Sequence, residues 1–208
     1  MTLNGLNMNT QEISPLALAG AAALVVDSAQ AQSPDTLVSR LKGQDEEARG
    51  DAWQKAGPAG AAAVGSVSAL WTDPDFEVAR SSKRAVWNIV RYAGRPGAAK
   101  EAKAVEAALL PLLGNPAAAV RREAIWMLSE IGGNDVIGPI AKLLSDVEVR
   151  DDARCALERL PGNKSIRALR DAMKSEPEVF RYALAESLRK RGEKVEGYPS
   201  QKLVPAKS

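Results

Sequence analysis

The 208-residue sequence predicts an all-α fold in which about five antiparallel helix pairs stack into a right-handed α-solenoid. Three observations predict this fold: a repeat that runs through most of the chain, an alanine-rich composition, and prolines and glycines at the expected helix boundaries. Aromatic residues make up only 4% of the chain, which suits close-packed helices better than a β-sandwich. The apolar share of 45% is sufficient for a continuous core.

The repeat is clearest in five segments that we expect to form the second helix of each pair. The first stripe residues of these segments are Ala48, Ser81, Val120, Val149 and Phe180, at successive separations of 33, 39, 29 and 31 residues. In each segment, apolar or small residues follow four, eight and often eleven positions later, which places them on one stripe of a helix. Recurrence of one pattern at a similar spacing indicates a repeat architecture.

Prolines and glycines predict where the helices begin and end. Prolines follow Ser33, Asp73, Asn115 and Glu176, and each falls in a first helical turn, where proline is tolerated. The predicted helix pairs cover residues 34–42 and 45–56, 60–71 and 75–93, 98–113 and 116–131, 134–144 and 147–160, and 163–174 and 177–191. The solenoid is expected to occupy residues 32–192, and residues 193–208 are expected to form a flexible C-terminal tail.

The N-terminal segment predicts a secretory signal peptide over residues 1–31. The apolar run 13–26 is followed by Ala29-Gln30-Ala31, a small-x-small cleavage pattern, and cleavage after Ala31 would release a soluble periplasmic or secreted protein. The run is too short for a stable membrane anchor, so no integral membrane segment is expected in the mature chain. No Lys or Arg precedes Arg40, unlike an ordinary signal, so the alternative is a capping helix of a cytoplasmic solenoid.

The composition argues against most catalytic and metal chemistry. The chain has no histidine, the usual general base near neutral pH and the commonest zinc ligand. Cys155 is the single cysteine, and we expect it to be a small packing residue. Acidic clusters such as Asp151-Asp152 lie at expected helix N-termini, where carboxylates favour the helix dipole. We therefore expect no enzyme activity, no cofactor and no metal site.

Two segments resemble the short HEAT-like repeats of the phycobilisome-lyase type. The first is Asn115-Pro116 followed by Val120-Arg121-Arg122-Glu123-Ala124, Leu128 and Ile131-Gly132, and the second is Asp146, Val149-Arg150, Ala153 and Leu157. The resemblance covers about residues 34–192, although the first two units depart from the pattern. It implies a solenoid whose second helices line a concave surface that binds partners.

Two tryptophans predict a binding surface on the second helices. The sixth position after each first stripe residue lies nearly opposite the core stripe and is occupied by Gln54, Trp87, Trp126, Cys155 and Glu186. We expect Trp87 and Trp126 to bind a partner together with neighbouring cations, namely Lys83, Arg84, Arg91 and Arg122. The alternative is that both rings pack between repeats. Three arginines beside the core stripe, Arg121, Arg150 and Arg181, are expected to be structural and to meet carboxylates of the adjoining unit.

These features favour a non-catalytic scaffold or adaptor that binds a protein partner on its concave face. One alternative is nucleic-acid binding through the basic segment 80–103, although nucleic acid is not the expected partner because the net charge is only +2 and acidic zones flank the segment. Another alternative is an enzyme of a lyase-type HEAT family, or its accessory subunit. The first helix pair and the charged last helix resemble polar caps, which predicts a monomer.

Overall fold

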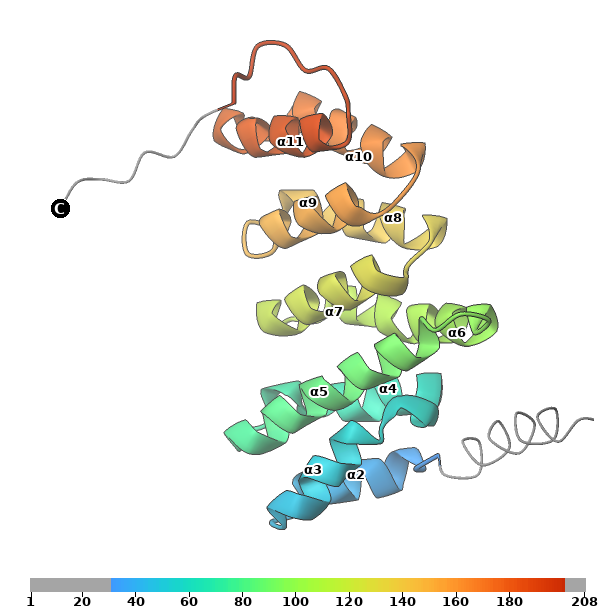
Figure 1. The fold of residues 1–208 in the computed structure, drawn as a ribbon. Helices are drawn as coiled ribbons and strands as arrows, with labels where there is room; N and C mark the ends of the chain where they lie inside the picture. The colour runs from blue at the N-terminus through green and yellow to red at the C-terminus, as the bar shows by residue number, and fades with distance from the viewer. Residues whose placement is uncertain (1–30, 201–208) are drawn as a thin grey trace, which may run out of the picture.

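The computed structural model describes residues 31–200, and this part of the chain consists of helices without any strand (Figure 1). Its ten α-helices are α2 (Pro34–Lys42), α3 (Glu46–Gln54), α4 (Gly60–Ser68), α5 (Phe76–Ala93), α6 (Ala99–Leu109), α7 (Ala118–Ile131), α8 (Asn134–Ala141), α9 (Arg150–Arg159), α10 (Asn163–Ser175) and α11 (Glu178–Lys190). Short 3-10 helices, η2 (Ala69–Thr72), η3 (Leu110–Gly114) and η4 (Lys142–Ser145), extend α4, α6 and α8. A further short turn, η1 (Gly57–Ala59), precedes α4.

The helices stack in chain order into two layers. The first helices α2, α4, α6, α8 and α10 contact one another in succession, with η3 completing the contact between α6 and α8. The second helices α3, α5, α7, α9 and α11 form the other layer, and each first helix packs against the second helix that follows it. Figure 1 shows the stack running from α2 and α3 at one end to α10 and α11 at the other. The predicted all-α solenoid is confirmed.

Short acidic or amide side chains organise the turn inside four of the helix pairs. Asp45, Asp73, Asn115 and Asp146 each accept a hydrogen bond from the backbone N–H two residues later, at 2.9–3.1 Å. This Asx turn reverses the chain between the first and second helix without any long-range contact. Helix starts are therefore specified locally, and Ser33 adds a side-chain cap to α2 at 3.2 Å from the Thr36 N–H.

The core follows the stripe that the repeat predicts. Ala124 and Leu128 on α7, and Ala153 and Leu157 on α9, are fully buried. They belong to one continuous core that extends from Leu37 on α2 to Leu188 on α11. Because alanine recurs four positions along most of these stripes, neighbouring helices can approach closely.

Two predicted segments fall wholly or partly outside the described residues. The signal-peptide prediction concerns residues 1–31, of which only Ala31 is described. Of the predicted tail, residues 193–200 lie against α10 and α11: Glu193 pairs with Arg170, and the rings of Tyr182 and Tyr198 meet edge to face at 5.3 Å. Within residues 31–200, no helix combines the length and the apolar character needed to cross a membrane.

Candidate functional site

The second helices present a continuous surface, which we call the second-helix face and define by α3, α5, α7, α9 and α11. All six residues predicted to bind a partner lie on two neighbouring helices of this face: Lys83, Arg84, Trp87 and Arg91 on α5, and Arg122 and Trp126 on α7. Both indoles and Lys83 are half-buried, whereas the three arginines are exposed. The tryptophans thus contact the packed layer and solvent at once.

Each of the two tryptophans is held by a carboxylate of the next repeat. The Nε1 of Trp87 donates to Glu123 on α7 at 3.1 Å, and the Nε1 of Trp126 donates to Asp152 on α9 at 2.9 Å. Glu123 and Asp152 occupy the same place in their repeats, the third position after the first stripe residue. Packing between repeats and partner binding are the alternatives that the sequence leaves open, and this geometry allows both roles for one ring.

On the C-terminal part of this face, formed by α7, α9 and α11, several cations pair with carboxylates within the chain. Arg122 pairs with Asp152 at 2.9 Å, and Arg159 pairs with Glu130 at 2.5 Å. Arg154 pairs with Glu158 at 3.5 Å and also donates to Ser187 on α11 at 2.8 Å. Because most of these contacts join neighbouring second helices, the charges serve to hold the stack together.

On the N-terminal part of the face, formed by α3 and α5, two arginines contact aromatic rings instead. The Arg84 guanidinium lies over the Trp53 ring, 5.1 Å from its centroid, and the Arg91 guanidinium lies over Trp87 at 5.4 Å. Among the residues that the structure describes, neither arginine has a carboxylate within ion-pair distance. We call Arg84 and Arg91 the open pair, since both side chains are exposed and their charge has no counter-ion within residues 31–200.

The open pair borders three adjoining hollows between α3 and α5, with volumes of about 460, 390 and 470 Å³. The first two hollows share Trp53 and Arg84, and the last two share Asn88 and Arg91. The three hollows are therefore neighbours along α3 and α5, and together we call them the α3–α5 groove. Trp53 is not predicted from the sequence as a binding residue, because it lies one position before the aligned site in a unit that departs from the repeat pattern.

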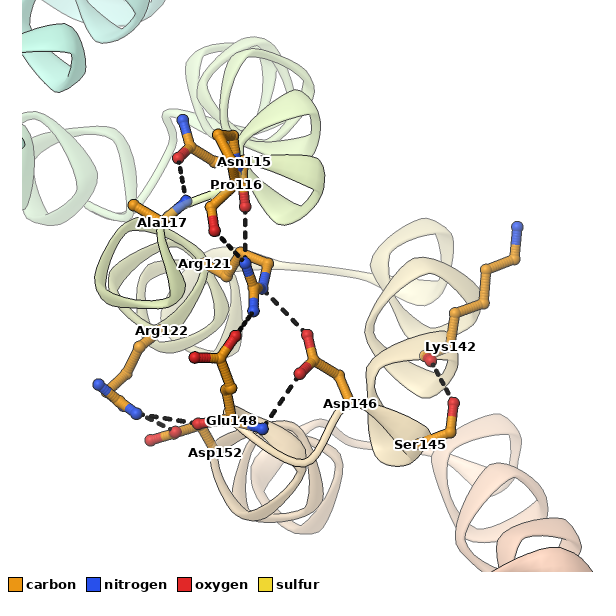
Figure 2. A network of polar contacts seen from close by, with 10 residues as sticks. All are labelled: Asn115, Pro116, Ala117, Arg121, Arg122, Lys142, Ser145, Asp146, Glu148 and Asp152. Atoms are coloured by element: carbon orange, nitrogen blue, oxygen red, sulfur yellow. Dashed lines mark hydrogen bonds and ion pairs between the residues drawn. The ribbon is translucent and has the colours of Figure 1, made fainter.

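Arg121 occupies the other prominent polar site, which is structural (Figure 2). Its side chain is nearly buried and donates to the backbone oxygens of Asn115 at 2.8 Å and Pro116 at 2.9 Å. The same guanidinium pairs with Asp146 at 3.0 Å and Glu148 at 2.8 Å, both in the adjoining repeat. This network matches the structural role expected for Arg121.

The other two arginines of that series contact different groups. Arg150 lies over the Phe180 ring at 4.8 Å from its centroid. Arg181 donates to the Glu176 backbone oxygen at 2.6 Å. Within residues 31–200, only Arg121 of the three therefore meets carboxylates of the adjoining unit, as expected, whereas Arg150 contacts a ring and Arg181 contacts a helix-start carbonyl.

Two carboxylates have lowered pKa values because cations hydrogen-bond to them. Lys55 and Arg40 lower the pKa of Asp51, and Lys103 lowers the pKa of Asp135. The Lys103 ammonium meets Asp135 at 2.5 Å and Glu106 at 2.8 Å, and these contacts raise the pKa of Lys103. The Asp51 contacts lie within the first helix pair, whereas the Lys103–Asp135 contact joins α6 to α8.

The second-helix face combines aromatic and cationic side chains. In the described part of the chain, no three histidine, cysteine or acidic side chains are arranged to hold a metal ion. Cys155 is half-buried and forms no disulfide. The face offers indole rings beside guanidinium groups, a combination that commonly dominates the binding energy of protein interfaces.

Comparisons with known proteins add the following. Residues 105–189, from within α6 to the last turn of α11, match the family model of HEAT repeats. The solved structures that are similar include the crystal structure of an engineered protein, with 22% sequence identity over 83% of this chain and 83% of that chain and a TM-score of 0.40. No curated protein sequence matches significantly. The matched range leaves out α2 to α5, whose units depart from the repeat pattern.

Proposed function

We propose that this chain, of which residues 105–189 match the family model of HEAT repeats, is a non-catalytic scaffold that binds a protein partner on its second-helix face. HEAT repeats generally act as protein-interaction scaffolds, because stacked helix pairs create long surfaces and leave no need for an enclosed active site. The observation that carries this proposal is the position of the open pair beside Trp53 and Trp87 along the α3–α5 groove.

The hydrogen bonds of Trp87 and Trp126 support this function further. A binding side chain that is already fixed loses little conformational entropy when a partner docks. Both indoles are fixed by a carboxylate of the next repeat, and both rings retain some exposure to solvent. A partner could therefore use them as rigid apolar anchors.

The basic segment 80–103 gives less support to nucleic-acid binding than its composition implies. Four of its cations pair with carboxylates: Arg80 with Glu77, Lys83 with Glu123, Arg95 with Glu101, and Lys103 with Glu106 and Asp135. Lys100 and Lys103 belong to α6, in the layer of first helices, and not to the second-helix face. A continuous track of free cations along a phosphate backbone is thus absent from this segment.

The scaffold proposal is tested by affinity capture with the purified protein immobilised as bait. Reversing the open pair with Arg84→Glu and Arg91→Glu is expected to abolish capture of the specific partner. The matched control is Lys142→Glu with Arg167→Glu, because both residues are exposed, border a hollow between α8 and α10, and have no carboxylate partner in residues 31–200. Equal capture by the wild-type chain and the α5 variant would overturn the proposal, provided that circular dichroism shows both to be folded.

We also propose that residues 1–31 are an export signal that is removed from a monomeric mature protein. Cleavage after Ala31 would spare the first described contacts, in which Gln32 accepts from Arg40 at 2.9 Å and Ser33 caps α2. The intact mass of protein recovered from the periplasm tests this, since processing predicts a chain that starts at Gln32. An unprocessed chain in the cytoplasm would contradict the export signal. The molar mass of the mature protein, measured by light scattering, tests whether it is a monomer.

A further inference from the structure

The open pair has a defined spacing along α5. Arg84 and Arg91 are seven residues apart, which is close to two helical turns, so they lie on the same side of the helix. At a rise of about 1.5 Å per residue, their attachment points are separated by about 10 Å along the helix axis. The two guanidinium groups therefore form a pair of cationic contacts at a fixed interval.

The repeat pattern shows that Arg84 replaces an acidic side chain. The third position after the first stripe residue holds Asp51, Glu123 and Asp152 in the first, third and fourth units, but Arg84 in the second. Glu123 and Asp152 use that position to accept an indole N–H from the preceding repeat. In the second unit the charge is reversed, so a cation faces Trp53 of the preceding repeat. The α3–α5 groove consequently differs in charge from the equivalent places farther along the stack.

Each arginine of the open pair remains available to an anion. Contact with an aromatic face orients a guanidinium but does not neutralise its charge. Guanidinium groups can bind carboxylates through two parallel hydrogen bonds. Elsewhere on this face, Arg122 and Arg159 each form an ion pair with a carboxylate of the same chain. Along the α3–α5 groove, no carboxylate of residues 31–200 fills this role for the open pair.

We propose that the partner segment that binds the α3–α5 groove is an extended acidic peptide with two carboxylates about three residues apart, an inference that rests on the proposed scaffold function. In the extended polyproline II conformation a chain has three residues per turn and advances about 3.1 Å per residue, so side chains three residues apart lie on the same side and span about 9 Å, close to the interval between the two arginines. The hollows of about 390 and 470 Å³ next to Arg91 leave room for side chains between the two carboxylates. Trp53 and Tyr92 supply apolar contacts along the same groove.

A peptide fits this groove better than a nucleic acid does. The free cations extend over only two turns of α5, whereas a nucleic acid requires cations at regular intervals along its backbone. The hollow at one end of the groove is also lined by Arg49 and Arg80, but Arg49 donates to the Gly43 backbone oxygen and Arg80 pairs with Glu77, so neither adds a free cation for continuing phosphates. A short acidic segment needs only the two cations of the open pair.

The test is a titration of the full chain followed by the indole N–H resonances of its four tryptophans. The probe is a short end-capped peptide of glycine and serine that carries two glutamates three residues apart. Binding in the groove is expected to shift the resonances of Trp53 and Trp87 and to leave that of Trp71 unchanged. The matched peptide with glutamine in place of glutamate is expected to produce no shift.

Variants decide whether the open pair carries this binding. Arg84→Gln with Arg91→Gln is expected to weaken glutamate-peptide binding about tenfold, as the loss of two charge pairs implies, whereas Lys142→Gln with Arg167→Gln leaves it unchanged. Equal weakening by both double variants, or equal binding of the glutamine peptide, would show the inference to be wrong. Tighter binding of oligothymidylate than of the glutamate peptide would replace it with nucleic-acid recognition.

The outcome also separates this inference from the scaffold function. If affinity capture depends on the open pair but the glutamate peptides do not bind, the acidic-peptide inference is wrong and the scaffold function stands. If the glutamate peptide binds at Trp53 and Trp87 while capture is unaffected by charge reversal, the groove recognises acidic segments but the captured partner uses a different surface. The second result would overturn the proposed function at this face.

Discussion

Arg122 on α7 and Arg84 on α5 are both exposed arginines of the second-helix face, yet their surroundings differ. Arg122 pairs with Asp152 at 2.9 Å and donates to the Glu148 backbone oxygen at 2.9 Å, so its charge ties α7 to the following repeat. Arg84 lies over Trp53 and has no such carboxylate in the described part of the chain. The two arginines lie on the two parts of one surface. Arg122 is fixed by an ion pair with the next repeat, whereas Arg84 forms no ion pair within residues 31–200.

This difference indicates how one repeat architecture divides its charges between stability and binding. Where consecutive repeats carry an acid at the third position, as Glu123 and Asp152 do, the face is stabilised by contacts within the chain. Where that position is basic, the contact is lost and the cation remains available to a partner. Substitutions of the paired residues on α7 and α9 should therefore lower stability, whereas substitutions of the open pair on α5 should weaken binding.

The largest expected effect is the loss of Arg121. Arg121→Gln removes a nearly buried guanidinium from Asp146, Glu148 and two backbone oxygens, and these groups do not all regain water. The free energy of unfolding is expected to fall by about 2–3 kcal/mol, measured by urea denaturation. Arg84→Gln is the control from the other part of the face. A comparable loss of stability in this variant would contradict the proposed difference between the two parts.

A smaller loss is expected when an indole hydrogen bond is removed. Trp126→Phe keeps an aromatic ring but loses the donor to Asp152, which should lower the free energy of unfolding by about 1 kcal/mol. Trp87→Phe should cost a similar amount through Glu123. Trp53→Phe, which removes no such carboxylate contact, should cost less, and thermal unfolding of the three variants under the same conditions makes this comparison.

Substitution of exposed arginines is expected to change the free energy of unfolding by a still smaller amount, and only in the C-terminal part of the face. Arg122→Gln and Arg159→Gln each remove an exposed ion pair and should each lower the free energy of unfolding by about 0.5 kcal/mol. Arg84→Gln and Arg91→Gln remove no ion pair formed within residues 31–200 and should leave the unfolding curve unchanged. A double variant of the open pair that unfolds earlier than Arg122→Gln would show that these arginines serve stability as well.

The smallest expected effect is the acid dependence that Asp51 and Asp135 contribute. Their pKa values are lowered in the folded chain, so the stability they add is present above the unfolded value of about 3.8 and is lost as the pH falls through the lower folded values. Asp51→Asn and Asp135→Asn should each reduce the slope of stability against pH in this acid range. Denaturation midpoints measured at pH values on either side of the unfolded value test this, and an unchanged slope would contradict it.

The fold was largely predictable because its signals are local. Pro34 with its Ser33 cap, the Asx turns at Asp73 and Asn115, and the stripe Val120–Ala124–Leu128 act within a few residues of one another, so a linear reading locates the helices closely. The second helices predicted at 75–93 and 116–131 are α5, Phe76–Ala93, and α7, Ala118–Ile131. Stacking of equivalent units then follows from the recurrence of the stripe.

The site was only partly predictable. The helical angle identified Trp87 and Trp126 as residues that point away from the local core, and the sequence alone left open whether they pack between repeats or face a partner. Trp53 was missed because Gln54 holds the aligned position in an irregular unit. The signal that could have located the indole contacts is the acid at the third position of the following unit, which is visible only when neighbouring repeats are compared.

The sequence by itself determined the helices, the turns between them and the stripe that each helix buries, because these depend on dihedral preferences and on a period of about 3.6 residues. Only the tertiary structure decided which charges are paired. Glu123 lies 36 residues from Trp87, Asp152 lies 26 residues from Trp126, and the offset between stacked repeats determines whether such groups meet. That offset results from the packing of whole helices, so the absence of a carboxylate partner for the open pair within residues 31–200 is a property of the stack.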